Sequence, residues 1–270
     1  MEEDMLPEKD KPAVSIVKIG GNVVDNPETL KAFLSDFEKL PGRKLLVHGG
    51  GVMASKLSRQ LGLEPKMLQG RRITDAETLK IVTMVYAGWI NKSIVALLQK
   101  LGCNAIGLSG ADGNIIPAKK RSPHPIDFGF AGDPEPERIG TEVLARLLES
   151  GLTPVICAIT HDEAGSLLNT NADTIAYLMG TALSSTYTTR LYYCFEKEGV
   201  LKDVNDANTL IPSIDKPEYL TYRAAGVIAD GMIPKMDNSF KSIEQGVSEV
   251  IILHAKNLLN GKGTRLVKGE

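Results

Sequence analysis

Two short apolar runs in this 270-residue chain each end in a cluster of glycines. Val17-Lys18-Ile19-Gly20-Gly21 closes the first run, and His48-Gly49-Gly50-Gly51 closes the second. If each run is a strand, its end opens into backbone whose N–H groups can approach an anion closely, because no Cβ stands in the way. Lys18 adds a full positive charge. The two clusters therefore predict a phosphate-handling site, although the sequence has no match to the G-x-x-x-x-G-K-[ST] pattern of P-loops.

Charge and cysteine content narrow the class of protein. Lysine and arginine number 31 against 33 aspartate and glutamate residues, so no excess of charge indicates a nucleic-acid or membrane partner. Three scattered cysteines are too few for a disulfide framework or a zinc site. The start, Met1-Glu2-Glu3-Asp4, lacks the apolar core of a signal peptide. We find no apolar run near the roughly 20 residues of a membrane span and expect a cytoplasmic location.

Strand-like and helix-like segments alternate along the chain, which is typical of an α/β fold with a largely parallel sheet. The predicted strands are 14–19, 44–47, 104–108, 153–158, 190–195 and 249–253, and the predicted helices are 27–40, 52–61, 77–101, 141–149, 169–179 and 233–246. Asn26-Pro27 suits the start of the first helix, and Thr74-Asp75-Ala76-Glu77 fits a capping box at the start of the third. Residues 113–138, rich in glycine, proline and charge, indicate hairpins over the sheet edge.

The second half of the chain has two charged residues near predicted helix starts. Asp173 follows Asn171, a suitable N-cap, and would lie in the first turn. Lys235 would lie one turn into a helix that begins near Pro234, where a positive charge is mildly unfavourable for the helix dipole. Taken alone, each has a simpler structural explanation: Asp173 complements the dipole, and Lys235 is a solvated surface lysine.

These motifs are much more specific in combination, and with them the chain resembles the amino acid kinase family. The matching segments run in the family's order from about residue 13 to 268. They are residues 17–21, 47–51, 70–74, 91–92, 127–133 and 169–173, and Asp230-Gly231-Met232 with Lys235. The resemblance implies a three-layer α/β/α sandwich with a mainly parallel, open central sheet. It implies that residues 1–160 bind an acyl amino acid and form a dimer, that residues 161–270 bind ATP, and that one continuous sheet joins them.

The 70–74 arginine motif and the 169–173 segment favour the branch of the family that phosphorylates an N-acyl-L-glutamate. The implied reaction transfers a phosphoryl group from MgATP to the γ-carboxylate, with N-acetyl-L-glutamate of arginine biosynthesis as the expected substrate. A glutamate-like carboxyl, with a pKa of about 4.3, is already a nucleophile at neutral pH, so no general base is needed. Mg²⁺ would be carried on the nucleotide phosphates, and no dedicated metal site is expected.

The resemblance also implies roles for individual residues. Lys18 and Lys235 would act in catalysis on the transferring phosphoryl group and the ATP phosphates, and Asp173 would hold both lysines in place. The implied substrate-binding residues are Gly50, Gly51, Arg72 and Asn169, and the implied nucleotide-binding or phosphate-binding residues are Gly20, Gly21, Glu196, Gly199 and Leu201. Arginine suits a carboxylate because its planar guanidinium can bond in a bidentate way. His48 is expected to orient or pack rather than to act as an acid or base.

The chain departs from the family pattern in two places. Phe195 and Glu196 stand where relatives usually have a small hydroxyl residue and an aspartate, which leaves the ribose and phosphate contacts open. Arg71 stands beside Arg72 where relatives commonly have an apolar residue. We favour a surface side chain that points away from Arg72. A competing interpretation is extra positive charge for a larger acyl group, which makes N-succinyl-L-glutamate a second candidate substrate.

The shared motifs do not by themselves exclude a different substrate or a protein without turnover. Carbamate, aspartate and UMP kinases have the same lysine and glycine motifs, and a non-catalytic ligand-binding sensor on the same fold belongs to a different class. Retention of both lysines and Asp173 favours catalysis. Residues 1–12 are few and contain two prolines, and Asn260 stands where arginine-inhibited relatives have a carboxylate. We therefore expect a homodimer that is insensitive to arginine and whose partners are small molecules.

Overall fold

The computed structural model describes residues 11–68, 70–203, 205–229 and 232–268. The predictions for residues 1–10 and for the Asp230-Gly231 pair lie outside the described residues. Within them the largest sheet has eight strands. Their order is β12 (Ser213–Ile214), β14 (Gly263–Leu266), β13 (Glu249–His254), β11 (Thr188–Phe195), β1 (Ala13–Ile19), β2 (Arg43–His48), β8 (Thr153–Cys157) and β5 (Ala105–Leu108). Every neighbouring pair is parallel except β13 with β14.

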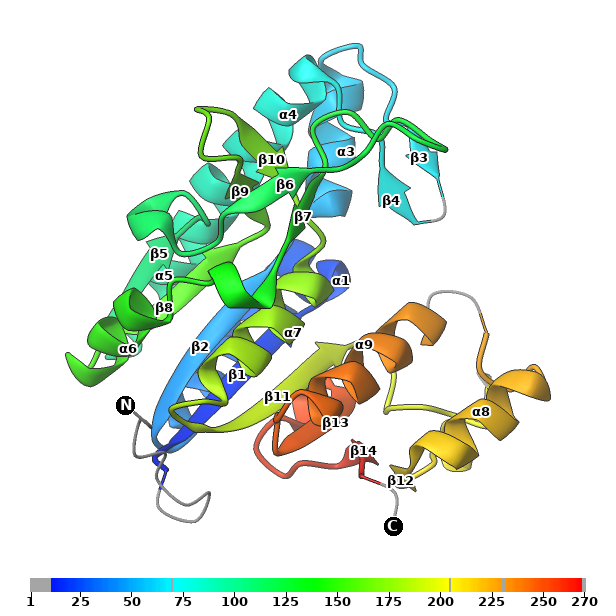
Figure 1. Cartoon of the computed structure of the whole chain (residues 1–270). Coiled ribbons are helices and arrows are strands. Elements are labelled where there is room, and N and C mark those ends of the chain that lie inside the picture. Colours follow the sequence, from blue (N-terminus) through cyan, green and yellow to red (C-terminus); the bar gives the residue numbers. More distant parts are fainter. Residues whose placement is uncertain (1–10, 69, 204, 230–231, 269–270) are drawn as a thin grey trace, which may run out of the picture.

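Helices cover this sheet, as the predicted fold class requires (Figure 1). The α-helices of the described residues are α1 (Gly21–Asp25), α2 (Pro27–Lys39), α3 (Gly51–Gln60), α4 (Ala76–Thr83), α5 (Asn91–Lys100), α6 (Thr141–Glu149), α7 (Ala172–Leu183), α8 (Lys216–Ala224) and α9 (Met232–Glu244). Helix α7 packs on β1, β2 and β11, and α9 packs on β13 and on α7. Helix α5 packs on β5, β8 and α2. The mainly parallel α/β fold that the sequence predicts is confirmed.

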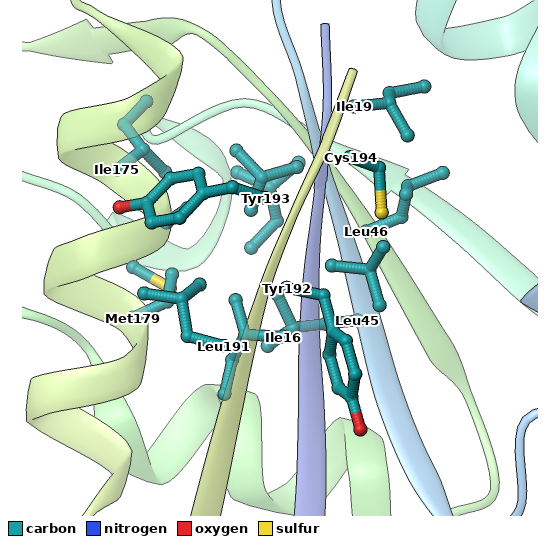
Figure 2. Close-up of a cluster of buried hydrophobic side chains, with 14 of the residues drawn as sticks. Ile16, Ile19, Leu45, Leu46, Ile175, Met179, Leu191, Tyr192, Tyr193 and Cys194 are labelled. Carbon is teal, nitrogen blue, oxygen red and sulfur yellow. The ribbon is translucent and has the colours of Figure 1, made fainter. Parts of the chain in front are cut away.

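The central strands are apolar on both faces because helices lie on both. Figure 2 shows Ile175 and Met179 of α7 beside Leu191 and Tyr193, whereas Tyr192 points away from that helix. Leu191 is fully buried and Tyr193 is 1% exposed. Strands enclosed in this way lack the alternation of apolar and polar residues that a half-exposed sheet shows.

Strand β1 lies at the centre of the sheet and pairs with β2 on one side and with β11 on the other. Ile19, its last residue, is in register with His48 and with Cys194. Since parallel strands end at the same edge, the loops that follow all three strands meet there. This register brings the two glycine clusters and Phe195 to one edge of the sheet.

The predicted caps of α2 and α7 are confirmed, whereas the predicted first residue of α7 and the predicted cap of α4 are wrong. The side chain of Asn26 caps α2, with Pro27 as its first residue, and the side chain of Asn171 caps α7. Helix α7 begins at Ala172 rather than at 169, because residues 167–169 form strand β10 (Leu167–Asn169), which pairs with β9 (Ile159–His161). The N-cap of α4 is Asp75 and not Thr74, since the Asp75 carboxylate accepts the N–H of Thr78 at 2.8 Å.

The predicted helix 77–101 is not a uniform α-helix. Between α4 and α5, residues Met84–Ile90 form a π-helical segment, η2. Short strands that the sequence did not predict are β3 (Met67–Leu68), β4 (Arg71–Arg72), β9, β10, β12 and β14. Strands β6 (Ala118–Lys120) and β7 (Gly132–Pro134) pair antiparallel and confirm a hairpin within 113–138.

The continuous helical run Ala76–Lys100 corrects the expectation that no apolar stretch reaches the length of a membrane span. Its length and composition, with a mean hydropathy of 1.5, would allow it to cross a membrane, and 44% of the apolar window is buried inside the protein. Its buried residues Ile81, Val82, Ile94 and Leu98 belong to the main hydrophobic core. Helices at the core of globular proteins pass the same test, and this one packs against the sheet.

Candidate active site

Three charged side chains from three elements meet near the carboxyl edge of the sheet. Lys18 lies on β1, Asp173 in the first turn of α7 and Lys235 in α9. Lys18 Nζ lies 2.6 Å from Asp173 Oδ1, and Lys235 Nζ lies 3.2 Å from Asp173 Oδ2. The side chains of the three residues are only 13–20% exposed. The carboxylate thus bridges two ammonium groups that are separated by 217 residues in the sequence.

The balance of burial and charge keeps Asp173 ionised. Burial raises the pKa of this carboxyl, but the positive charges of Lys18 and Lys235 outweigh burial and bring the pKa to about 2. At neutral pH the cluster therefore carries two positive charges and one negative charge. The simpler explanation of Asp173, that it only complements the helix dipole, does not account for its contacts with two lysines. The simpler explanation of Lys235 does not hold either, because its side chain is largely buried. An excess positive charge held in place suits a site that binds anions.

Residues at the end of β11 support this cluster. The Tyr193 hydroxyl donates to the backbone carbonyl of Asp173 at 3.2 Å. Lys235 Nζ lies 5.7 Å from the centre of the Phe195 ring, within the range of a cation–π contact. Gly20 N–H donates to the carbonyl of Cys194 at 2.9 Å, which ties the first glycine cluster to the same strand end.

The second glycine cluster starts α3 and packs closely on the π-helical segment. A Cβ atom placed on Gly50 would lie 2.3 Å from Ile90 Cδ1 and 2.9 Å from Tyr86 Cδ1. Residue 50 must therefore be glycine for a packing reason, in addition to the access to backbone N–H groups that the sequence suggested.

A buried hydrogen-bond network fixes the loop that carries the second glycine cluster. His48 is fully buried, and its Nδ1–H donates to the carbonyl of Gly49 at 2.8 Å. His48 Nε2 accepts from Asn91 Nδ2 at 3.1 Å, and the same amide group donates to the carbonyl of Val155 at 2.9 Å. Burial lowers the pKa of His48 to about 4, despite the opposing effect of the Gly49 carbonyl. The imidazole is thus neutral and orients the loop.

We expect this neutral histidine to make the folded state sensitive to acid. The ordinary pKa of histidine is about 6.5, so the stability contributed by the neutral ring is fully present above that pH. It is lost as the pH falls towards 4, by up to roughly 3 kcal/mol. Urea unfolding between pH 7.5 and 4 should show this loss in the wild type. His48→Gln, which cannot take up a proton, should show a smaller loss, and equal losses in both proteins would contradict the assignment.

A pocket lies beside the glycine cluster and contains all four of the predicted substrate-binding residues. Its lining residues are Gly49, Gly50, Gly51, Met67, Gly70, Arg71, Arg72, Tyr86, Arg121, Phe128, Ala131, Gly132, Ala158, Asn169, Thr170, Asn171 and Ala172. Gly50, Gly51, Arg72 and Asn169 are thus brought together. Asn171 and Ala172 directly precede Asp173, so the pocket lies beside the start of α7.

Arg72 is held firmly in this pocket and is 7% exposed. Its Nη2 donates to the Gly51 carbonyl at 2.8 Å and to Ser55 Oγ at 2.7 Å. Its Nη1 is buried and has no partner. A buried guanidinium nitrogen without a partner is costly, and a carboxylate ligand would satisfy it. Strand β4, which places Arg72, was not predicted from the sequence.

Thr74 connects two residues of the pocket wall, and Arg71 belongs to that wall. The fully buried Thr74 hydroxyl donates to the Arg72 carbonyl at 3.2 Å and accepts from Asn169 Nδ2 at 3.0 Å. This connection explains why Thr74 does not cap α4. Arg71 is exposed and is among the residues that line the same pocket as Arg72, and the direction of its side chain relative to Arg72 stays a prediction.

A second pocket lies among the loops of the C-terminal part. It is lined by Lys197, Gly199, Val200, Leu201, Lys202, Asp203, Gly226, Val227, Ile228, Ala229 and Met232. Gly199 and Leu201 were predicted to bind nucleotide. Glu196 is exposed and is not among the lining residues. The sequence did not indicate Lys197, Lys202 or the 226–229 turn, since short loop segments give no periodic signal.

The remaining predictions concern the first glycine cluster and metal binding. Gly20 and Gly21 line neither pocket and lie instead at the start of α1, next to the charged cluster. In the part of the chain that the structure describes, no group of three or more His, Cys, Asp or Glu residues could hold a metal ion. Lys235 lies one helical turn after Met232 of the second pocket.

The cation-rich cluster at the carboxyl end of this mainly parallel sheet lies next in sequence to lining residues of both pockets, since Asp173 follows Ala172 and Lys235 lies one turn after Met232. The family model described as "Amino acid kinase family" matches residues 13–254. The chain belongs to the amino acid kinase family, which confirms the resemblance found in the sequence.

Two relatives and one solved structure are similar to this chain over nearly its whole length. The acetylglutamate kinase of Bacteroides fragilis is 50% identical over 263 residues, covering 97% of this chain and 100% of the relative. That of Bacteroides thetaiotaomicron is 51% identical over 255 residues, covering 94% and 98%. Among solved structures, smu.665 from Streptococcus mutans UA159 superposes with a TM-score of 0.77 at 25% identity, covering 94% of this chain and 98% of the other.

Proposed function

We propose that this protein is an enzyme that transfers the γ-phosphoryl group of ATP to the γ-carboxylate of N-acetyl-L-glutamate. The observation that carries the proposal is the Asp173 carboxylate, which pairs with both Lys18 and Lys235. Asp173 directly follows a residue of the pocket that contains Arg72, and Lys235 lies one helical turn after a residue of the pocket that contains Gly199. Two relatives about 50% identical over nearly the whole chain bear the name acetylglutamate kinase, which supports this substrate.

The proposed chemistry consists of positioning and charge neutralisation. The attacking carboxylate is ionised at neutral pH and needs no base, and the neutral, buried His48 is not required as one. The transferring phosphoryl group carries negative charge on its equatorial oxygens. Lys18 would neutralise this charge from β1, and Lys235 would neutralise the ATP phosphates from α9. Arg72 would hold the carboxylate that does not react, and the backbone of Gly20, Gly21, Gly50 and Gly51 would line the path of the reaction.

We further propose that the two parts of the chain bind different substrates. Residues 1–160 would supply most of the acyl amino acid site and the dimer contact, with Asn169 added from strand β10. Residues 161–270 would bind ATP, which enters with Mg²⁺ on its phosphates. We also propose a cytoplasmic homodimer that arginine does not inhibit. Light scattering that gives a hexamer, or inhibition by micromolar arginine, would contradict this part.

A coupled ADP-release assay with a panel of acceptors tests the proposed function. We expect the highest kcat/KM for N-acetyl-L-glutamate, and hydroxylamine should trap the acyl phosphate product. The panel includes N-succinyl-L-glutamate, because Arg71 lines the pocket, and also carbamate, L-aspartate and UMP. A clear preference for another acceptor would overturn the substrate assignment. Tight binding of N-acetyl-L-glutamate without ADP release would instead support a non-catalytic sensor.

A further inference from the structure

The π-helical segment Met84–Ile90 places a tyrosine against the loop that carries the second glycine cluster. Tyr86 is 5% exposed and lines the pocket that contains Arg72. In the 25-residue helical run Ala76–Lys100, only this segment departs from α-helical geometry within the described residues. Such π-helical turns inside α-helices occur frequently at functional sites. Tyr86 has no role in the mechanism described above.

The contacts of Tyr86 show how its hydroxyl is aimed. Its ring packs under Gly50, where a Cβ atom would lie 2.9 Å from Cδ1 and 3.0 Å from Cε1. Its hydroxyl lies beside Gly51: a Cβ atom there would be 3.9 Å from Tyr86 Oη and also 3.9 Å from Arg72 Nη2. The phenol and the guanidinium therefore flank the same glycine on the pocket wall.

The hydrogen bonds of Arg72 leave its carboxylate site incomplete. A guanidinium binds a carboxylate best through two parallel N–H···O bonds. In this protein, both N–H groups of Nη2 are occupied by the Gly51 carbonyl and Ser55 Oγ. The buried Nη1 is left for a ligand. A carboxylate bound there through one oxygen needs another donor for its second oxygen, and Tyr86 supplies a hydroxyl on the same wall.

We propose that the Tyr86 hydroxyl donates a hydrogen bond to the same substrate carboxylate as Arg72, namely the α-carboxylate that is not phosphorylated. This inference rests on the proposed function, because it concerns the acyl amino acid that the enzyme would bind. Burial raises the pKa of Tyr86, although the charge of Arg72 and a side-chain hydrogen bond with Arg72 oppose it. The phenol oxygen accepts that bond, which leaves the O–H free to donate. The phenol therefore remains a neutral donor across the physiological range of pH.

Tyr86→Phe tests the inference, because it removes the hydroxyl and keeps the ring that packs under Gly50. We expect KM for N-acetyl-L-glutamate to rise about tenfold, as for one lost hydrogen bond to a charged group. The KM for ATP and the melting temperature should change little. Tyr177→Phe is the matched control: that hydroxyl bonds to Gln245 in the C-terminal part, so KM for N-acetyl-L-glutamate should stay at the wild-type value.

An analogue without the α-carboxylate identifies the substrate group involved. 4-Acetamidobutyrate keeps the reacting carboxylate and the acetyl amide, and its inhibition constant should be the same for the wild type and Tyr86→Phe. An equal loss of affinity for both compounds would overturn the inference, because Tyr86 would then contact another part of the substrate. Normal wild-type turnover with an unchanged KM in Tyr86→Phe would also overturn it. A wild type that neither binds nor phosphorylates N-acetyl-L-glutamate would overturn the proposed function, and this inference with it.

Discussion

Replacing Lys18 with alanine is expected to lower kcat by roughly 10²–10³-fold, or about 3–4 kcal/mol of transition-state stabilisation. The proposed role of Lys18 is strongest while the phosphoryl group is in transfer, because negative charge then develops between two anionic reactants. Its loss leaves Asp173 paired with Lys235, so the site keeps a balanced ion pair and the protein should stay folded. The KM values for ATP and for N-acetyl-L-glutamate should therefore change much less than kcat.

Steady-state kinetics on Lys18→Ala, together with a thermal melt, measures this effect. Lys31→Ala is the control, because Lys31 is an exposed lysine of α2 that pairs only with Glu28 in the described structure. It should behave as the wild type. A Lys18→Ala enzyme whose kcat stays within threefold of the wild type would remove Lys18 from the mechanism.

Asp173→Asn is expected to lower kcat at least about tenfold, or roughly 1.4 kcal/mol in barrier height. The change removes the single negative charge that lies 2.6 Å from Lys18 and 3.2 Å from Lys235. The two ammonium groups would then repel each other and lose charge-assisted hydrogen bonds, which would move them away from the transferring oxygens. Small displacements at such a site are costly to the rate.

A second aspartate at a helix start separates this effect from that of helix capping. Asp215 caps α8 through its side chain and forms a capping box with Glu218, and it is not part of the charged cluster. Asp215→Asn should cost less than about 1 kcal/mol in stability and leave kcat unchanged, since asparagine is a good N-cap. If Asp173→Asn gave the same mild result, Asp173 would be a helix-start residue only.

Much of the fold could be predicted because the relevant signals are local. Buried parallel strands are continuous apolar runs, so the predicted strand 14–19 matches β1 (Ala13–Ile19) within one residue. Caps such as Asn26 and Asn171 depend on a few neighbouring residues. The grouping of Lys18, Asp173 and Lys235 came from the resemblance to a family, since nothing local relates residues so far apart in the sequence.

The missed features depend on contacts between distant segments. Tyr86 occurs in an apolar helical pattern and could not be distinguished from a core residue, because its contact with Gly50 joins segments that are far apart in the sequence. Thr74 fits a capping box by sequence, but Asn169 occupies its hydroxyl in the folded chain. Glu196 occupies the family's aspartate position, yet the structure leaves it exposed and outside the second pocket.

The position of β1 has a consequence for how the protein can be divided. Its hydrogen bonds join β2 on one edge and β11 on the other, so a cut between residues 160 and 161 would leave one edge of β1 and one edge of β11 without a hydrogen-bonding partner. Such exposed edges promote aggregation. Neither half could serve as an independently folding module, and each should be insoluble when produced alone. Fragments made together could pair β1 with β11 again, so only co-expression should yield soluble protein.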